Sequence, residues 1–240
     1  MYGKEVRGMK SWLTESALTV LVGYGGSGKS ECAVNLALTL TKHGVPAALA
    51  DLDVVNPYFR SRQRRELLKQ HGIRFVATSQ ACVDADLPVV PAQLNTLLQN
   101  RELYSVLDVG GGGGGARVLA PSRRWILNRS HRVCFVLNAS RPGTNTVEGA
   151  IASLREIEEN TGLKVTHIIH NTHLCEETTP ADIREGERLA RSVSGMTGLP
   201  ILCHAVYHTL AEQLSDLPEP LFPLHLYLNK PWEEPETEVY

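Results

Sequence analysis

The chain has 240 residues, of which 42% are hydrophobic and 21% charged, and its formal net charge is −2. This near-neutral charge excludes the strong positive field that draws many proteins to nucleic acid or anionic membranes. No stretch of the sequence approaches the ~20 apolar residues that span a bilayer. The N-terminus lacks the apolar run of a signal peptide, and the five cysteines form no C-x-x-C pair. These features predict a cytoplasmic protein with no membrane attachment.

Short apolar runs alternate with longer helical stretches along the chain. Continuous apolar strands separated by helices favour a parallel sheet that is covered on both faces. The expected strands are 17–23, 45–51, 73–78, 104–109, one within 131–140, 164–171 and 199–206, and the expected helices are 29–43, 60–72, 88–100, 145–162 and 180–195. The sequence therefore predicts a single α/β domain over residues 1–240, with three layers, a lead-in at 1–15 and an acidic tail at 229–240.

The stretch GYGGSGKS, residues 23–30, fills the phosphate-loop pattern G-x-x-x-x-G-K-[ST] between an expected strand and an expected helix. Its glycines let backbone N–H groups close around phosphate oxygens, and the following helix directs its positive end at them. Lys29 is expected to reach the β- and γ-phosphates, and the Ser30 hydroxyl is expected to bind Mg²⁺. The residues expected to contact a nucleotide here are Gly25, Gly26, Ser27, Gly28, Lys29, Ser30 and Glu31.

The segment that starts at this loop resembles the deviant Walker A ATPases of the MinD/ParA group, the CobQ/CobB/MinD/ParA nucleotide-binding domains. In that group K-G-G-x-G-K-[ST] is followed by an A-x-N-L-A helix and by a strand that ends in D-x-D. Here GGSGKS (25–30), AVNLA (33–37) and DLD (51–53) match, and a weaker resemblance continues to about residue 215. The resemblance implies a P-loop NTPase fold with a mostly parallel central sheet, ATP and Mg²⁺ as ligands, a homodimer and a protein partner.

Three carboxylates follow the expected strands. By the resemblance, Asp53 orients the attacking water, Asp51 supports the Mg²⁺ shell, and Asp108 is the Walker B aspartate after the apolar run YSVL. These roles also suit the chemistry, because phosphoryl transfer needs Mg²⁺ held and a nucleophile positioned. Catalysis is thus expected from Asp53 and Lys29, and metal ligation from Ser30, Asp51 and Asp108. The alternative is that Asp51 and Asp53 are only polar residues at a strand end.

Tyr24 stands where the MinD/ParA group has its signature lysine, which crosses the dimer interface to the partner's phosphates. Tyrosine has no positive charge, so either hydrolysis is slow, another cation does the work, or dimerisation around ATP differs. A basic cluster follows the D-x-D segment and contains Arg60, Arg62, Arg64, Arg65 and Lys69. We interpret it as a trans-acting arginine, as a docking surface for an acidic partner or nucleic acid, or as a solvated helix face.

Six consecutive glycines, 110–115, follow Asp108. In P-loop proteins this segment senses the γ-phosphate through a glycine N–H and moves on hydrolysis. Gly110 and Gly111 are therefore expected at the nucleotide. Because glycine loses the most backbone entropy on ordering, the run is interpreted as a mobile switch or as a very close backbone approach to phosphate or to a partner. The alternative is an incidental flexible loop.

The guanine-reading pattern N-K-x-D is incomplete, because Thr172 and Leu174 occupy its Lys and Asp positions. Adenine is therefore favoured, and Asn171 is placed at its edge by resemblance to the family's late-strand asparagine. His167, His170 and His173 are not interpreted as a metal site. Positions 167 and 170 of a strand point to opposite faces of the sheet.

The expected function is that of a Mg-ATP-binding ATPase used as a switch, with slow hydrolysis, ATP-dependent dimerisation and a protein partner. Three alternatives stay open. Loss of the signature lysine allows a non-hydrolysing nucleotide-binding module, and the range of activities on this fold allows an ATP-dependent small-molecule kinase or ligase. The basic cluster allows a DNA-partitioning ATPase. The tail is not a basic amphipathic helix, so MinD-like lipid binding is not expected.

Overall fold

The computed structural model of the chain describes residues 12–13, 15–53, 64–77 and 92–228. The tail at 229–240, most of the lead-in, and Arg60 and Arg62 of the basic cluster lie outside these residues. The described part contains one eight-stranded sheet of order β3-β2-β4-β1-β5-β6-β7-β8, in which every neighbouring pair is parallel. Its strands are β1 (Leu18–Val22), β2 (Ala47–Leu52), β3 (Arg74–Ala77), β4 (Tyr104–Val109), β5 (His131–Leu137), β6 (His167–His170), β7 (Ile201–Tyr207) and β8 (Leu221–Leu224).

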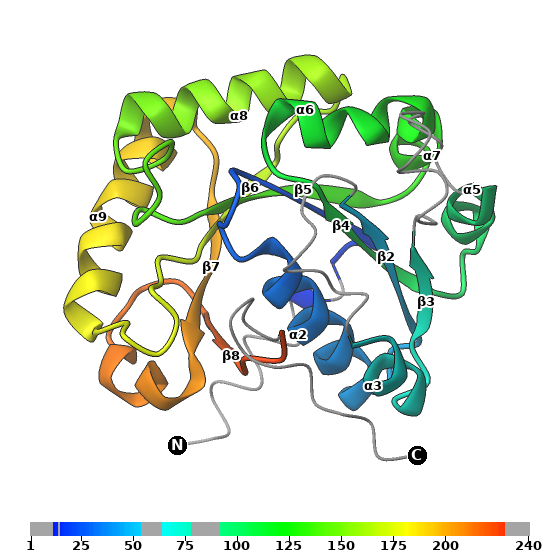
Figure 1. The fold of residues 1–240 in the computed structure, drawn as a ribbon, viewed down its shortest axis with the longest axis horizontal. Helices are drawn as coiled ribbons and strands as arrows, with labels where there is room; N and C mark the ends of the chain where they lie inside the picture. Colours follow the sequence, from blue (N-terminus) through cyan, green and yellow to red (C-terminus); the bar gives the residue numbers. More distant parts are fainter. Residues whose placement is uncertain (1–11, 14, 54–63, 78–91, 229–240) are drawn as a thin grey trace.

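Helices cover both faces of this sheet, which makes three layers (Figure 1). One face carries α2 (Lys29–Lys42) and α3 (Arg65–Gln70). The other carries α5 (Ala92–Gln99), α6 (Gly112–Ala116), α7 (Arg123–Leu127), α8 (Val147–Thr161) and α9 (Pro180–Thr197). Two 3₁₀ helices, η2 (Arg117–Ser122) and η3 (His208–Leu214), join these elements. The predicted three-layer α/β architecture is confirmed.

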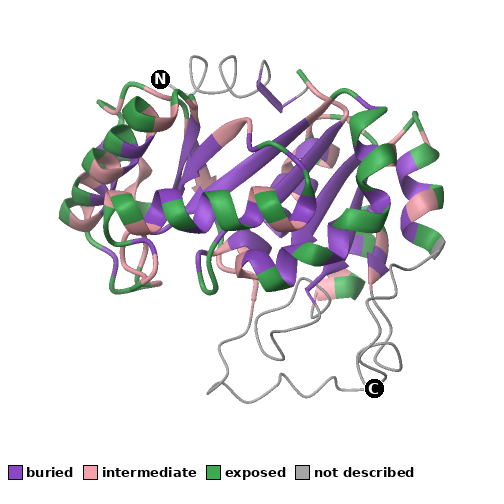
Figure 2. Cartoon of the chain, turned by 90° about the horizontal axis from the view of Figure 1, so that it is seen from above, coloured by how far each residue is buried: buried purple, intermediate pink, exposed green. Residues whose placement is uncertain are grey.

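The core consists of two apolar layers, one on each side of the sheet. Figure 2 shows buried strands in the centre, with the exposed residues on the outer sides of the helices. On one side Phe135 and Leu107 pack with α5, α8 and α9, and on the other Leu21 and Val136 pack with α2. Each fully buried side chain of this size contributes roughly 1.5–3 kcal/mol. Burial of the central strands on both faces explains why they are continuous apolar runs in the sequence.

The ends of the two longest helices follow local sequence signals. Thr146 begins α8 by accepting a hydrogen bond from the Gly149 N–H, and Gly162 ends it at φ 66°. Thr179 and Asp182 form a capping box at the start of α9, where Pro180 takes the first helical turn. The predicted boundaries therefore agree with the structure to within a few residues.

Five elements were not predicted: α6, η2, α7, η3 and β8. Strand β8 escaped prediction because Pro223 lies inside a run of only four residues, and proline lowers strand propensity. The strand is nevertheless compatible with the sheet because it is an edge strand. Short helices such as α7 lack a full apolar period that a sequence pattern could display.

The six-glycine run is a packed segment that enters helix α6 at Gly112. A Cβ atom at Gly115 would lie 2.6 Å from the backbone carbon of Gly110, and one at Gly113 would lie 2.7 Å from the Glu156 side chain on α8. The structure therefore shows close packing of the run within the domain, whereas the mobile switch and the approach to phosphate or a partner stay predictions. Glycine is required at position 115, because a Cβ atom there would collide with the backbone of Gly110.

Cysteines of the described part are free thiols. Cys32, Cys134 and Cys203 are buried in the apolar layer beside α2, as expected for small core residues. Burial raises the pKa of all three thiols. No helix among the described residues is long and apolar enough to cross a membrane.

The glycines of α6 provide a matched pair of substitutions. At Gly115 an added Cβ meets backbone, whereas at Gly114 it meets nothing within 4 Å. We expect Gly115→Ala to lower the free energy of unfolding by ~1–3 kcal/mol through overpacking. Gly114→Ala should raise it by ~0.4–1 kcal/mol by restricting the unfolded chain. Urea midpoints measure both effects, and equal effects of the two substitutions would contradict the packed helix.

Candidate functional site

Carboxyl ends of the five central strands meet at one edge of the sheet. Strand β1 runs into the phosphate loop, and its neighbours β4 and β5 end beside it. Beyond them, β2 ends near Asp51 and Asp53, and β6 ends near Asn171. Ligands of open parallel sheets bind at this edge, where the order of strands reverses. The topology therefore brings together the residues that the sequence marked at separate places.

The phosphate loop, residues 23–28, makes a tight turn between β1 and α2. Gly28 has φ 86° and stands at the N-terminus of α2, so its N–H and those of the next residues point into the loop. A Cβ atom at Gly28 would lie 2.2 Å from Nδ2 of Asn171. Only glycine combines this backbone conformation with this contact. The Ser27 hydroxyl is buried beneath the loop without a hydrogen-bond partner.

Lys29 is buried, and its ammonium group closes the loop from inside. Nζ donates hydrogen bonds to the carbonyl oxygens of Gly23, at 3.2 Å, and Tyr24, at 2.8 Å. Burial lowers the pKa of Lys29, and the charges of Asp108 and Asp53 act in the opposite direction. The ammonium charge is thus concentrated where the loop would receive phosphate oxygens.

Asp51, Asp53 and Asp108 lie together beneath this lysine. Asp51 and Asp108 occupy paired positions of β2 and β4, and all three carboxylates are buried. Oδ1 of Asp51 accepts the backbone N–H of Asp53 at 3.1 Å. Burial raises the pKa of Asp108, and the nearby charge of Asp51 raises it further. A contact with the Ser30 hydroxyl lowers this pKa. The structure thus brings the predicted carboxylates to Lys29 and Ser30.

The residues at Asp108 fit a Mg²⁺ ion. Both oxygens of Asp108 are buried without a hydrogen bond of normal geometry. Such oxygens need a cation or water, because leaving a buried carboxylate without a partner is costly. No group of three or more His, Cys, Asp or Glu side chains among the described residues is arranged to hold a metal by itself. One buried carboxylate beside the Ser30 hydroxyl is compatible with Mg²⁺, which binds through one or two carboxylates, water and substrate phosphates.

Three glycines of the run lie against the site. A Cβ atom at Gly110 would lie 3.1 Å from Oδ1 of Asp53, and one at Gly111 would lie 2.8 Å from Cα of Gly25. The N–H of Gly112 donates to the carbonyl of Gly23 at 3.0 Å. The segment after β4 is therefore in backbone contact with the phosphate loop. A displacement of the loop would therefore also displace the start of α6.

Asn171, at the end of β6, is buried against the phosphate loop. Its Nδ2 donates to the Ser27 carbonyl at 2.8 Å. This bond supports the loop from the side opposite to the carboxylates. Leu174, at the position of the missing guanine-reading carboxylate, is 44% exposed. The predicted contact of Asn171 with a base stays a prediction.

Tyr24 is partly exposed beside the phosphate loop, whereas two arginines of the basic cluster contact other parts of the chain. The Tyr24 side chain is 37% exposed, and a Cβ atom at Gly143 would lie 2.3 Å from its ring. Arg64 donates to the carbonyl of Tyr227, and the guanidinium of Arg65 lies 5.5 Å from the centre of the Phe75 ring. These two arginines therefore have partners within the chain, while Lys69 is exposed.

Sequence reasoning missed Arg141 and His173. Nε of Arg141 donates to the carbonyl of Gly26 at 2.8 Å, and Nε2 of His173 would lie 2.8 Å from a Cβ at Gly28. Loss of hydration lowers the pKa of His173 to about 4, and the charge of Arg141 acts in the same direction. The available signal was positional, since both residues follow strands whose carboxyl ends flank the phosphate loop.

Glu31 does not direct its side chain to the loop. Its carboxylate accepts the backbone N–H of Tyr227 at 2.6 Å and of Leu228 at 3.2 Å. Asn35, one turn later on α2, exchanges two hydrogen bonds with the backbone of His225. The first turns of α2 thus anchor the segment after β8. The predicted nucleotide contact of Glu31 rests on its backbone N–H alone.

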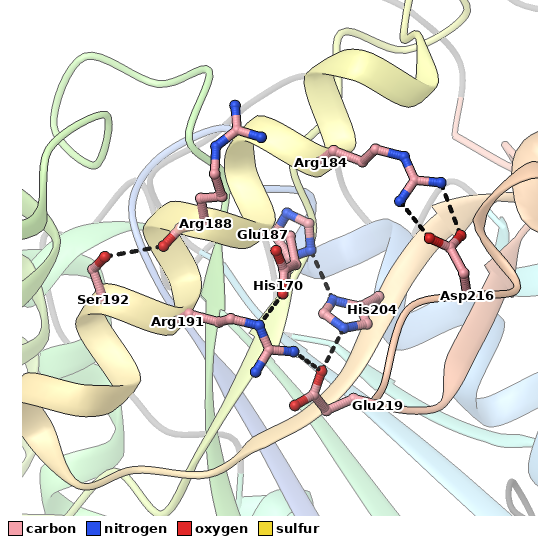
Figure 3. Close-up of polar contacts among 9 residues, drawn as sticks. All are labelled: His170, Arg184, Glu187, Arg188, Arg191, Ser192, His204, Asp216 and Glu219. Carbon is pink, nitrogen blue, oxygen red and sulfur yellow. Dashed lines mark hydrogen bonds and ion pairs between the residues drawn. The ribbon is translucent and has the colours of Figure 1, made fainter.

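A directed chain of hydrogen bonds lies beside β6 (Figure 3). Nε2 of His204 donates to Glu219 at 2.8 Å, because a carboxylate only accepts. In the neutral ring Nδ1 of His204 then accepts from Nδ1 of His170 at 3.0 Å. Nε2 of His170 in turn accepts from the Thr172 hydroxyl at 2.9 Å. Burial lowers the pKa of both histidines, that of His170 to about 3, and so favours their neutral forms, while the adjacent Glu219 acts in the opposite direction on His204.

The three predicted histidines have separate partners. His167 contacts the Thr166 hydroxyl, His170 belongs to the directed chain, and His173 faces Gly28 and Cys175. Arg191 joins Glu219 to Glu187 at the outer end of the chain, and Arg184 pairs with Asp216 nearby (Figure 3). This arrangement fastens α9 to the segment between η3 and β8.

Comparison with solved structures identifies the architecture. The cell division protein FtsY of Thermotoga maritima is 19% identical with a TM-score of 0.54, and the match covers 77% of this chain and 59% of that one. The chloroplast FtsY of Physcomitrella patens is 19% identical with a TM-score of 0.52, over 77% and 56% of the two chains. The signal recognition particle 54 kDa protein of Aeropyrum pernix K1, solved with GDP, is 22% identical with a TM-score of 0.50, over 77% and 40%.

The fold is that of a P-loop NTPase. The matched region spans between 40% and 59% of the length of these three proteins. No protein-family model matches the chain, and no curated protein matches it. The finer resemblance to the MinD/ParA group stays a prediction.

The anchoring carboxylate of Glu31 generates a pH prediction. Burial raises the pKa of Glu31 from its ordinary value of 4.5 to about 7, against the lowering effect of the two backbone N–H groups. The folded chain therefore holds this proton more tightly than the unfolded chain. The associated stability is fully present below pH 4.5 and is lost as the pH rises to about 7.

Glu31→Gln removes this titration. The comparison is made without nucleotide or Mg²⁺. Between pH 4.5 and 7.5 we expect the free energy of unfolding of the unchanged protein to fall, relative to that of Glu31→Gln, by up to ~3 kcal/mol. This magnitude follows from ~1.4 kcal/mol per pKa unit. Urea unfolding at a series of pH values measures the difference. Two parallel stability curves would contradict a raised pKa for Glu31.

Proposed function

We propose that the chain binds Mg-ATP, hydrolyses it slowly and acts as a nucleotide-dependent switch. In this proposal the ATP-bound form dimerises and presents a surface to a protein partner, and nucleotide state changes the population that the partner binds. The observation that carries the proposal is the meeting of Lys29, Ser30 and the carboxylates of β2 and β4 under one phosphate loop.

Each residue of the site has a role that follows from its position. Backbone N–H groups of Gly25, Gly26, Ser27 and Gly28 and of the first turn of α2 receive phosphate oxygens. Lys29 exchanges its two carbonyl partners for β- and γ-phosphate oxygens, which carry more negative charge. Ser30 and Asp108 hold Mg²⁺, with Asp51 behind them. A bound Mg²⁺ ion neutralises charge that develops on the phosphates.

Asp53 is the group placed to orient the attacking water. Its backbone is fixed by Asp51, and its carboxylate lies against Gly110. Water attacks the γ-phosphorus, the bond from that phosphorus to the bridging oxygen breaks, and the water proton ends on inorganic phosphate. Gly110 and Gly111 follow the γ-phosphate because they lie between Asp53 and the phosphate loop. Their movement would pass directly into α6, which packs on α8 through Gly113.

Adenine is the proposed base, because the carboxylate that reads guanine is missing at Leu174. Asn171 supplies the polar group at the base edge in this proposal. The likeness to a signal recognition particle protein solved with GDP favours guanine as a second candidate. The exposed Tyr24 lies on the outer side of the phosphate loop, where a second subunit would reach it.

Binding of nucleotide tests the site itself. We expect Mg-ATP to bind more tightly than Mg-GTP and Lys29→Ala to weaken ATP binding about 10- to 100-fold, as loss of a charged hydrogen bond of ~1.5–3 kcal/mol implies. Isothermal titration calorimetry measures the affinities. Lys42→Ala is a matched control, because Lys42 is exposed at the far end of the same helix. An unaltered affinity of Lys29→Ala would count against the site, and tighter GTP binding would reverse the choice of base.

Molar mass in solution tests the switch. Asp53→Ala should bind ATP and retain it, since the water-orienting carboxylate is lost. We expect light scattering after size exclusion to give a dimer with Mg-ATP and a monomer with Mg-ADP or without nucleotide. A monomer in all three states, with ATP demonstrably bound, would reject the dimerising switch. It would favour a binding module or an enzyme that acts on a small molecule.

A further inference from the structure

The segment after β5, residues 138–144, carries an arginine to the phosphate loop. Nε of Arg141 donates to the carbonyl of Gly26 at 2.8 Å. A Cβ atom at Gly26 would lie 3.1 Å from the central carbon of the guanidinium group. The planar end of Arg141 therefore lies against the outer backbone of the loop. Residues 138–144 come from β5, which pairs directly with the strand that leads into the loop.

This segment is a rigid support. The N–H of Arg141 donates to the carbonyl of Asn138 at 3.3 Å, and the N–H of Thr144 donates to the carbonyl of Arg141 at 2.9 Å. The buried Thr144 hydroxyl donates to the same Asn138 carbonyl at 2.7 Å. Oδ1 of the buried Asn138 accepts the N–H of Ser140 at 2.9 Å. Such a closed turn limits the positions that Arg141 takes, which is what a group acting on phosphate needs.

The charge of Arg141 is not neutralised within the described part of the chain. No salt bridge between described residues includes it, and its hydrogen bond to Gly26 uses Nε alone. A guanidinium group has five N–H donors in a fixed fork, which matches phosphate oxygens. Arg141 is half-buried, and its charge lowers the pKa of His173, whose backbone is hydrogen-bonded to the Asn138 side chain of the same turn. A cation is therefore held at the loop, and the N–H groups of its two terminal nitrogens are available to a ligand.

Tyr24 contributes to this arrangement. Its ring packs so tightly on Gly143 that a Cβ there would lie 2.3 Å from the ring. The residue that replaces the expected lysine thus contacts the same turn that carries Arg141. The Tyr24 contact at Gly143 and the Arg141 contact at Gly26 thus connect the turn to the loop at two places.

We propose that Arg141 supplies, within one subunit, the positive charge at the terminal phosphates that Tyr24 lacks. In this proposal Tyr24 is a positioning residue that holds the 138–144 turn against the phosphate loop. Arg141 donates N–H groups to phosphate oxygens as the bond to the bridging oxygen lengthens and negative charge grows on the departing ADP. The inference rests on the proposed function, because it requires a nucleotide at residues 23–30.

The test compares ground-state and transition-state affinities. We expect Arg141→Ala to bind Mg-ADP within about threefold of the unchanged protein. It should bind Mg-ADP with aluminium fluoride, which mimics the transferring phosphoryl group, at least tenfold more weakly. The single-turnover rate of ATP hydrolysis should fall by a similar factor. Arg141→Lys should recover part of both effects, because it keeps the charge and loses the fork.

Two further variants separate chemistry from structure. Arg188→Ala is the matched control, since Arg188 is exposed on α9 and points away from the polar cluster in Figure 3. Tyr24→Ala should weaken the aluminium fluoride complex while Tyr24→Phe preserves it, because the ring and not the hydroxyl contacts Gly143. Thermal unfolding establishes that each variant is folded.

Two outcomes overturn the inference in distinguishable ways. If the unchanged protein binds nucleotide and Arg141→Ala matches it in both the aluminium fluoride affinity and the rate, Arg141 has no such role and the proposed function stands. If the unchanged protein binds neither ATP nor GTP, the proposed function fails and this inference fails with it.

Discussion

Burial of Lys29 beside Asp108 and Asp53 is the interaction on which the site depends. Burial lowers the pKa of the lysine and raises that of Asp108, so mutual attraction does not replace the hydration that these groups lose. Hydrogen bonds from the lysine to two carbonyl groups of the loop compensate for part of its lost hydration. Asp108 is compensated less, because the Ser30 hydroxyl lowers its pKa but neither carboxylate oxygen has a hydrogen bond of normal geometry. A ligand that brings both an anion for Lys29 and a cation for Asp108 would complete both groups at once, and a Mg-nucleotide has that composition.

Glycine serves two opposite purposes in this domain. In the phosphate loop, Gly28 permits a backbone conformation that other residues rarely adopt. In the run after β4, Gly111 and Gly115 instead remove side chains so that backbones can touch. The second purpose mechanically joins the loop to α6 and, through Gly113, to α8. Helix α8 therefore packs directly on the segment that contacts the phosphate loop.

Local signals made much of the domain predictable. The strand into the phosphate loop, the D-x-D strand and the ends of α8 follow from apolar runs and capping residues. Three-dimensional packing decided the rest. Helix α6 forms although glycine has a low helix propensity, and β8 forms although it contains a proline, which has a low strand propensity. Arg141 has no motif of its own, and only the pairing of β5 with β1 brings it to the loop.

The directed chain from Thr172 to Glu219 ties together positions that are distant in the sequence. The Thr172 hydroxyl also accepts the N–H of Ala139, so the chain begins at the turn that carries Arg141. Each link fixes which nitrogen of the next ring holds the hydrogen. A change at 219 from an acceptor to a donor would leave two donors facing each other at 204. The hydrogen-bond directions at residues 170, 172, 204 and 219 therefore depend on one another, and a substitution that turns one acceptor into a donor changes the tautomer required of the next ring.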